Sequence, residues 1–105
     1  MTLLPKLKSE FFKALGHPTR IKIIELLEAG ELCVCTIYEE LEQSQPNVSQ
    51  HLSKLKNANI VKSRKEGLKV FYSLKNEEIA QILKTSRKII LDQINETRKD
   101  IIGKE

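Results

Sequence analysis

The sequence predicts one mainly α-helical domain with a small β-hairpin (α+β), with its elements in the order α-α-α-α-β-β-α. Apolar residues recur every three or four positions over most of the chain, as on the buried face of a helix. Between residues 60 and 74 the pattern changes to two short strands separated by Glu66-Gly67. The 105 residues suit one domain and contain no repeat, so we expect residues 1–105 to form a single unit.

The first two helices are predicted on either side of Gly16-His17. Within residues 5–15, helical spacing is set by Leu7, Phe11, Phe12 and Leu15. Pro18 suits the first turn of the second helix, because the N–H that proline lacks would have no partner there. The second helix has a broad apolar face, and we expect it to end at Gly30.

Two further helices are separated by a short break at Gln43-Ser44. The first runs from about Val34 to Glu42. Ser44 is a good N-cap for the second, Pro46 fits its first turn, and Asn59 suits a left-handed stop. The apolar face of this second helix consists of Val48, Leu52 and Leu55. Its other face is polar and carries Gln45, Asn47, Ser49, Gln50, Ser53, Lys54 and Asn57.

Two short helices joined by a tight turn, the second polar on its outer face, are typical of a helix-turn-helix. The basic hairpin that follows is typical of a wing, so the predicted fold is a winged helix-turn-helix. The last helix starts near Asn76, where Glu77 and Glu78 complement its positive end. Its apolar stripe consists of Ile79, Ile82, Leu83, Ile90 and Ile94. This stripe has more apolar surface than a small domain leaves exposed to solvent.

The net charge of +4 is unevenly distributed along the chain. Residues 45–75 contain one acid, Glu66, and seven bases: Lys54, Lys56, Lys62, Arg64, Lys65, Lys69 and Lys75. A basic third on a slightly acidic body is what a polyanion-binding surface would produce. The charge alone favours a solvated surface. Because the basic residues lie on the predicted helix-turn-helix and wing, their position favours DNA binding.

Several classes of protein are excluded by what the sequence lacks. No apolar stretch approaches the roughly 20 residues of a membrane span, and the start does not resemble a signal peptide, so we expect a cytoplasmic protein without membrane contact. There is no nucleophile–base set and no phosphate loop, which predicts that the protein is not an enzyme and requires no cofactor. Cys33 and Cys35 are too close in sequence for an unstrained disulfide, so we expect free thiols.

The chain resembles the ArsR/SmtB family of metal-responsive winged-helix repressors. The resemblance rests on the order and spacing of four segments: Ala14-Leu15-Gly16-His17-Pro18-Thr19-Arg20, Glu31-Leu32-Cys33-Val34-Cys35, Ser44-Gln45-Pro46-Asn47-Val48-Ser49-Gln50-His51-Leu52 and Phe71-Tyr72-Ser73-Leu74. It implies a homodimeric repressor that binds double-stranded DNA at an imperfect palindrome, with its first and last helices forming the dimer. The predicted dimer residues are Leu7, Phe11, Ile79, Ile82, Leu83 and Ile90, and several of these are also expected to close the monomer core.

The predicted DNA contacts divide by chemistry. Gln45, Ser49 and Gln50 lie at positions that the family uses for DNA contact, and the Gln50 amide can pair with adenine. His51 either touches DNA or is a structural histidine beside the core. Phosphate contacts are predicted for Lys54, Lys62, Arg64, Lys65 and Lys69. Asn47 and Ser53 complete the predicted set.

Cys33 and Cys35 stand where the family's thiol sensor begins, which implies release from DNA by a thiophilic ion such as arsenic(III), cadmium, lead or zinc. Tyr38 occupies the place of the third thiol of an arsenic-type site. Two residues at i and i+2 of a regular helix point about 200° apart, so both thiols reach one ion only if the helix start is distorted. Four alternatives stay open: a redox-responsive regulator, a constitutive one, a winged-helix protein-interaction module, and a thiol metal-binding protein whose DNA role is incidental.

Overall fold

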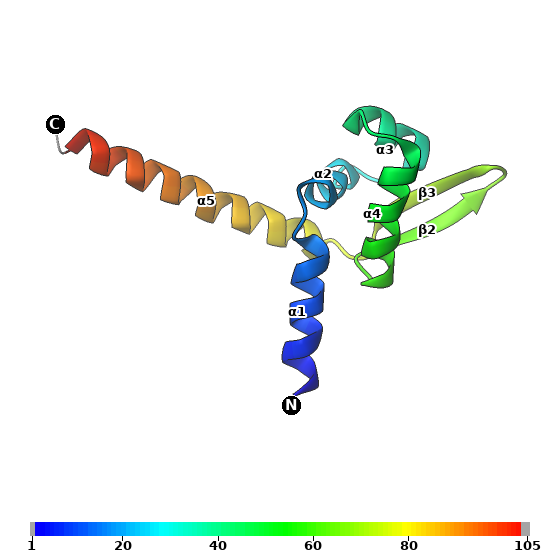
Figure 1. Cartoon of the computed structure of the whole chain (residues 1–105), viewed down its shortest axis with the longest axis horizontal. Coiled ribbons are helices and arrows are strands. Elements are labelled where there is room, and N and C mark those ends of the chain that lie inside the picture. Colours follow the sequence, from blue (N-terminus) through cyan, green and yellow to red (C-terminus); the bar gives the residue numbers. More distant parts are fainter. Residues whose placement is uncertain (1, 104–105) are drawn as a thin grey trace.

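The computed structural model describes residues 2–103 and has the predicted fold class, a winged helix-turn-helix (Figure 1). The helices are α1 (Leu3–Leu15), α2 (Pro18–Leu27), α3 (Val34–Leu41), α4 (Gln45–Asn57) and α5 (Glu78–Gly103). The strands are β1 (Leu32–Cys33), β2 (Val61–Glu66) and β3 (Lys69–Leu74). The predicted single domain also includes residues 1, 104 and 105, which lie outside the described residues.

Strand β1 was not predicted, and the expected order α-α-α-α-β-β-α is wrong in omitting it. The sheet has three antiparallel strands in the order β1-β3-β2, with Cys33 paired to Phe71. Two residues are too short to show an alternating pattern, and Leu32-Cys33 leads directly into the apolar stripe of α3. The consequence is that the cysteine segment is hydrogen-bonded to the wing.

The core lies behind α4. Val48, Leu52 and Leu55 on this helix are fully buried. The side chains that pack around them from α2, α3, β2 and the residue before β2 include Ile23, Ile24, Ile37, Val61 and Ile60. Because full burial of each such side chain stabilises by about 1.5–3 kcal/mol, α4 is fixed firmly in its orientation.

The predicted helix signals of α4 are confirmed by local geometry. The Ser44 hydroxyl accepts a hydrogen bond from the Asn47 amide at 3.3 Å and caps the helix. Asn59 is left-handed, with a φ of 60°, and follows the C-cap Ala58. Gly67 has a φ of 62° at the hairpin turn, a backbone conformation that glycine adopts without steric cost.

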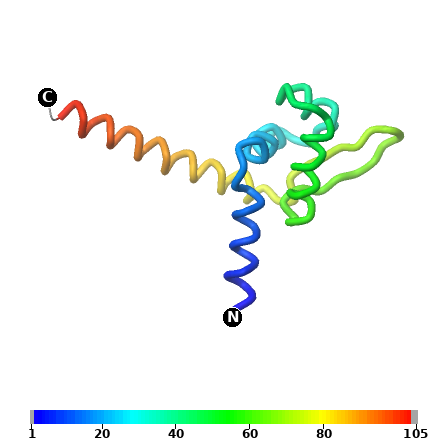
Figure 2. Tube along the Cα trace, viewed as in Figure 1, coloured from blue at the N-terminus to red at the C-terminus, as the bar shows by residue number. Residues whose placement is uncertain are grey.

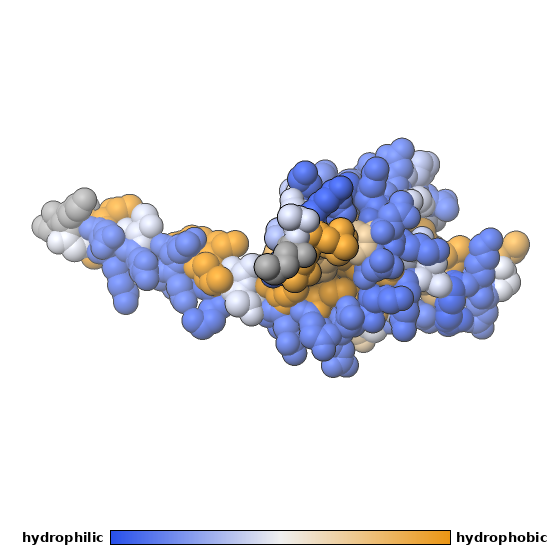
Figure 3. Space-filling model, turned by 90° about the horizontal axis from the view of Figure 1, so that it is seen from below, coloured by the Kyte–Doolittle hydropathy of each residue, from blue (hydrophilic) through white to orange (hydrophobic). Residues whose placement is uncertain are grey.

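Helices α1 and α5 project from the body as two arms, away from the wing (Figures 1 and 2). The radius of gyration is 16.8 Å, whereas a compact chain of this length has about 13 Å. Apolar surface gathers where the arms meet the body and continues along α5 (Figure 3). The exposed large apolar side chains on the arms are Leu3, Leu4, Leu7, Phe12, Ile89, Ile90, Leu91, Ile94, Ile101 and Ile102.

No helix among the described residues combines the length and apolar content that crossing a membrane requires.

The residues predicted for the dimer differ in their exposure. Leu7 and Ile90 are exposed, at 49% and 53%. Phe11, Ile82 and Leu83 are half-buried. Ile79 is only 3% exposed, so it belongs to the core of the single chain and offers little surface to a partner.

Candidate nucleic-acid interface

Helix α4 has one polar face that is open to solvent. The exposed residues of the predicted contact set on this helix are Gln45, Asn47, Ser49, Gln50, Ser53 and Lys54. The fully buried Val48 and Leu52 alternate with them along the helix. Since the opposite face is locked into the core, the polar side chains share one outward direction.

Asn47 is tied to α2 through a chain of side-chain hydrogen bonds. Its amide donates to the carbonyl oxygen of Gln43, whose own amide donates to the Thr19 hydroxyl at 3.2 Å. Thr19 is buried at the start of α2. The turn between α3 and α4 is therefore fixed to the helix behind it.

His51 is half-buried and contacts two residues from the start of α2. The Arg20 Nε donates to His51 Nδ1 at 3.1 Å, so this nitrogen carries no proton. The rings of His17 and His51 lie 4.4 Å apart, centroid to centroid. Burial, the nearby His17 and the Arg20 charge, in that order, lower the pKa of His51. Sequence reasoning missed Arg20 as its partner, because 31 residues separate the two.

The wing carries the predicted phosphate-binding cations, but Arg64 differs from the others. Lys62, Lys65 and Lys69 are exposed and make no ion pair with any described residue. Arg64 forms ion pairs with Glu31 at 2.6 Å and Glu66 at 2.8 Å. The hydrogen bond from Arg64 is the main cause that lowers the pKa of Glu31. The basic wing thus contains one neutralised cation.

The cysteines form a disulfide, so the prediction of free thiols is wrong for this structure. Cys33 is the N-cap of α3 and has extended backbone, with φ −65° and ψ 145°. It therefore lies outside the helix, and the argument from helical directions does not apply to the pair. The two Cα atoms are 5.2 Å apart, within the usual disulfide range of roughly 4.4–6.8 Å.

A groove of about 290 Å³ lies between the cysteines, α4 and the wing. Its walls include Cys33, Cys35, Tyr38, Gln45, Ser49, Lys69 and Tyr72. The cysteine pair therefore borders the same groove as Gln45 and Ser49, which are predicted to read bases, and Lys69, which is predicted to contact phosphate. Among the described residues there is no group of three or more His, Cys, Asp or Glu side chains that could hold a metal ion.

A polar helix backed by a core and flanked by a basic hairpin defines a DNA-binding transcriptional regulator of the winged helix-turn-helix class. The chain belongs to the arsR family of bacterial regulatory proteins, whose family model matches residues 17–63. It is accordingly a regulator and not an enzyme.

Three relatives illustrate this membership. An uncharacterised HTH-type transcriptional regulator of Methanocaldococcus jannaschii is 49% identical over 77 residues, which cover 72% of this chain and 86% of that protein. A cadmium resistance transcriptional regulatory protein CadC homolog of Staphylococcus aureus is 46% identical over 76 residues, which cover 71% of this chain and 63% of that protein. The crystal structure of Rv0081 of Mycobacterium tuberculosis superposes with a TM-score of 0.82 at 36% identity, covering 90% of this chain and 95% of that one.

Proposed function

We propose that the chain is a homodimeric, sequence-specific repressor whose α4 helix enters the major groove of DNA while the wing follows the backbone. The observation that carries this proposal is the exposed polar face of α4, held rigid by the buried Val48, Leu52 and Leu55. The major groove of B-DNA admits one helix, and each base pair presents a distinguishable hydrogen-bond pattern there. Such a regulator acts on the chromosome, so the proposal includes the predicted cytoplasmic location.

The proposed contacts follow the chemistry of each side chain. The Gln50 amide pairs with adenine, and Gln45, Asn47, Ser49 and Ser53 bind base edges or phosphates. Lys54, Lys62, Lys65 and Lys69 neutralise phosphates and supply affinity without sequence information. His51 acts mainly through its bond with Arg20, which holds α4 against α2.

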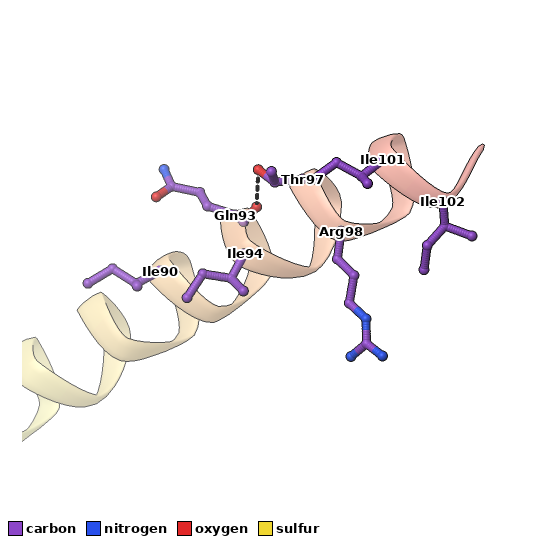
Figure 4. Close-up of a pocket in the computed structure, with 7 residues that line it drawn as sticks. All are labelled: Ile90, Gln93, Ile94, Thr97, Arg98, Ile101 and Ile102. Carbon is purple, nitrogen blue, oxygen red and sulfur yellow. Dashed lines mark hydrogen bonds between the residues drawn. The ribbon is translucent and has the colours of Figure 1, made fainter. Parts of the chain in front are cut away.

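A second copy of the chain is the proposed partner of the two arms. Side chains of α5 alone line a hollow near its end: Ile90, Gln93, Ile94, Thr97, Arg98, Ile101 and Ile102 (Figure 4). No other described element covers this apolar stretch, and a two-fold dimer would bury it together with the exposed face of α1. The two α4 helices would then lie about 34–36 Å apart, which matches an imperfect palindrome.

Cys33 and Cys35 are the proposed inducer site. When reduced, they offer two thiolates, which suit arsenic(III), cadmium, lead or zinc. The similarity to a CadC homolog supports a thiophilic ion. Because the pair borders the groove between α4 and the wing, an ion held there would change the space next to Gln45, Ser49 and Lys69. Binding of the ion and binding of DNA would then oppose each other equally in both directions.

The disulfide favours a second candidate signal, a change of thiol redox state. In this alternative, the two thiols give two electrons and two protons to one molecule of glutathione disulfide. A sulfur–sulfur bond forms between Cys33 and Cys35, and two molecules of glutathione are released. The same groove would respond, but to an oxidant in place of an ion.

The proposal is tested by selecting duplexes from a random DNA library with the reduced wild-type protein, then titrating the selected duplex at several salt concentrations. We expect an imperfect palindrome and binding that weakens steeply with salt. Arsenite, cadmium and glutathione disulfide are then added separately, with the Cys33→Ser/Cys35→Ser variant as control. Release of the wild type alone by an ion supports ion sensing, and release by glutathione disulfide alone supports redox sensing.

Two outcomes would contradict the proposal. If wild type and double variant respond identically to all three compounds, the cysteines are not the inducer site, and if neither protein responds, the regulator is constitutive toward these compounds. If no duplex binds even at low salt, the chain is a winged-helix protein-interaction module and DNA reading by α4 is wrong.

A further inference from the structure

The guanidinium of Arg64 binds side chains of the protein itself. Its Nε donates to both Glu31 oxygens, at 3.0 Å and 2.9 Å, and one terminal nitrogen donates to Glu31 at 2.6 Å. The other terminal nitrogen donates to Glu66 at 2.8 Å. The central carbon lies 4.7 Å from the centroid of the Phe71 ring. Three of its five N–H donors are thus directed at carboxylates, so its charge is already paired within the protein.

The contact between Arg64 and Glu31 joins two segments whose backbones are not paired with each other. Arg64 is on β2 and Glu31 directly precedes β1, but the strand order β1-β3-β2 puts β3 between them. Phe71 on β3 is opposite Cys33 on one side and opposite Arg64 on the other. The Arg64 side chain therefore reaches across the central strand to the start of the cysteine segment.

The Arg64–Glu31 pair is better suited to fixing an orientation than to stabilising the fold. The two side chains are 51% and 33% exposed, and ion pairs of that exposure add little to the free energy of folding. Their geometry is nevertheless restrictive, since a forked guanidinium bonds both oxygens of one carboxylate and also contacts a ring. Without this pair, only the backbone pairing of β3 would join the wing to β1.

We propose that Glu31, Arg64 and Phe71 form a latch that holds the wing against the strand carrying Cys33. Arg64 is then a positioning residue of the DNA-binding surface and not the phosphate contact that its charge predicts. This inference rests on the proposed reading of DNA by α4 and the wing. The latch also connects the cysteine segment directly to the wing through β1. A second connection runs from the same segment to α4 through α3.

The first test needs no DNA. Amide hydrogen exchange of β2 and β3 is compared in the wild type, Glu31→Gln and Arg64→Gln, with Lys65→Gln as a matched control from the same strand. The latch predicts faster exchange in β2 and β3 for the first two variants, unchanged exchange in α4, and wild-type behaviour for the control. Wild-type exchange in all three variants would overturn the latch, whatever the protein does with DNA.

The second test is a double-mutant cycle on the duplex selected by the wild type. The latch predicts that Glu31→Gln and Arg64→Gln each weaken binding roughly 2- to 30-fold, and that the double variant is no worse than either. The salt dependence should stay as in the wild type. A phosphate contact predicts the opposite: Arg64→Gln lowers the salt slope by about 0.9 for each protomer of the dimer, and Glu31→Gln frees the cation and tightens binding.

Discussion

Among single residues, His51 makes the stability of the fold around α4 sensitive to pH, because its burial, the nearby His17 and the Arg20 charge lower its pKa. Above about pH 6.5, the usual pKa of histidine, His51 is neutral in both the folded and the unfolded chain, and its bond with Arg20 is intact. Because the folded pKa is lowered, the unfolded chain takes up the proton first as the pH falls. Stability is therefore lost from about pH 6.5 down through the lowered pKa of His51.

We expect His51→Gln to lose less stability than the wild type between pH 7.5 and pH 5. Glutamine keeps an oxygen that can accept from Arg20 Nε, but it does not titrate. The measurement is the free energy of unfolding in urea at both pH values. An equal loss in variant and wild type would assign the pH dependence to other groups.

Gln50 and Lys54 separate base reading from backbone contact on the same exposed face of α4. Gln50→Ala should weaken binding to the selected palindrome by about 1–3 kcal/mol and leave binding to unrelated DNA unchanged. Lys54→Ala should weaken both alike and reduce the salt slope by about one for each protomer. Equilibrium titration on both duplexes measures this difference, and an equal effect of Gln50→Ala on both would remove its role in sequence reading.

Tyr38 offers a gain-of-function test of ion sensing, because it borders the same groove as both cysteines. Tyr38→Cys adds a third thiol at the position where the arsenic-type site has one. In the reduced protein, the arsenite concentration for half release from DNA should fall at least about tenfold, which corresponds to 1.4 kcal/mol. Tyr38→Ser controls for loss of the ring, and an arsenite response of the cysteine variant no stronger than that of the serine variant would count against the proposed site.

At the scale of elements, α4 could be predicted completely, whereas β1 could not. Ser44, Pro46 and the regular burial of Val48, Leu52 and Leu55 are local signals, and local signals are visible in sequence. The Arg64–Glu31 pair joins residues 33 apart, so nothing near either residue reveals it. The prediction of free thiols fails because Cys33 adopts the extended geometry of an N-cap and not helical geometry.

The hydroxyl of Ser44 caps α4 and should contribute to its stability. Ser44→Ala removes the acceptor of the Asn47 amide and should cost about 1 kcal/mol, lowering Tm by roughly 4–8 °C. Ser53→Ala is the matched control, since Ser53 is exposed within the same helix and alanine favours a helix interior. Thermal unfolding followed by circular dichroism gives both values, and an equal Tm for the two variants would mean that the cap contributes nothing.

At the scale of the whole molecule, the single chain leaves much of its apolar surface without a partner. The arms extend the molecule to 62 Å along one axis but only 22 Å along another. Beyond the start of α5, no described residue of that helix is buried. In proteins, most helical stability comes from tertiary packing of an apolar face. The arms therefore need the second copy that the proposed dimer supplies.

Ile94→Glu tests this need, since Ile94 is exposed and lies outside the core. If the dimer buries Ile94, the new charge should cost about 3 kcal/mol and raise the dimer Kd roughly a hundredfold. Asn95→Glu adds the same charge at the neighbouring position and should leave the dimer intact. Sedimentation velocity measures the association state, and hydrogen exchange in α4 verifies that the core is unchanged. A monomer that keeps its core but loses the selected palindrome would link the arms to DNA reading, because each α4 alone contacts one half-site.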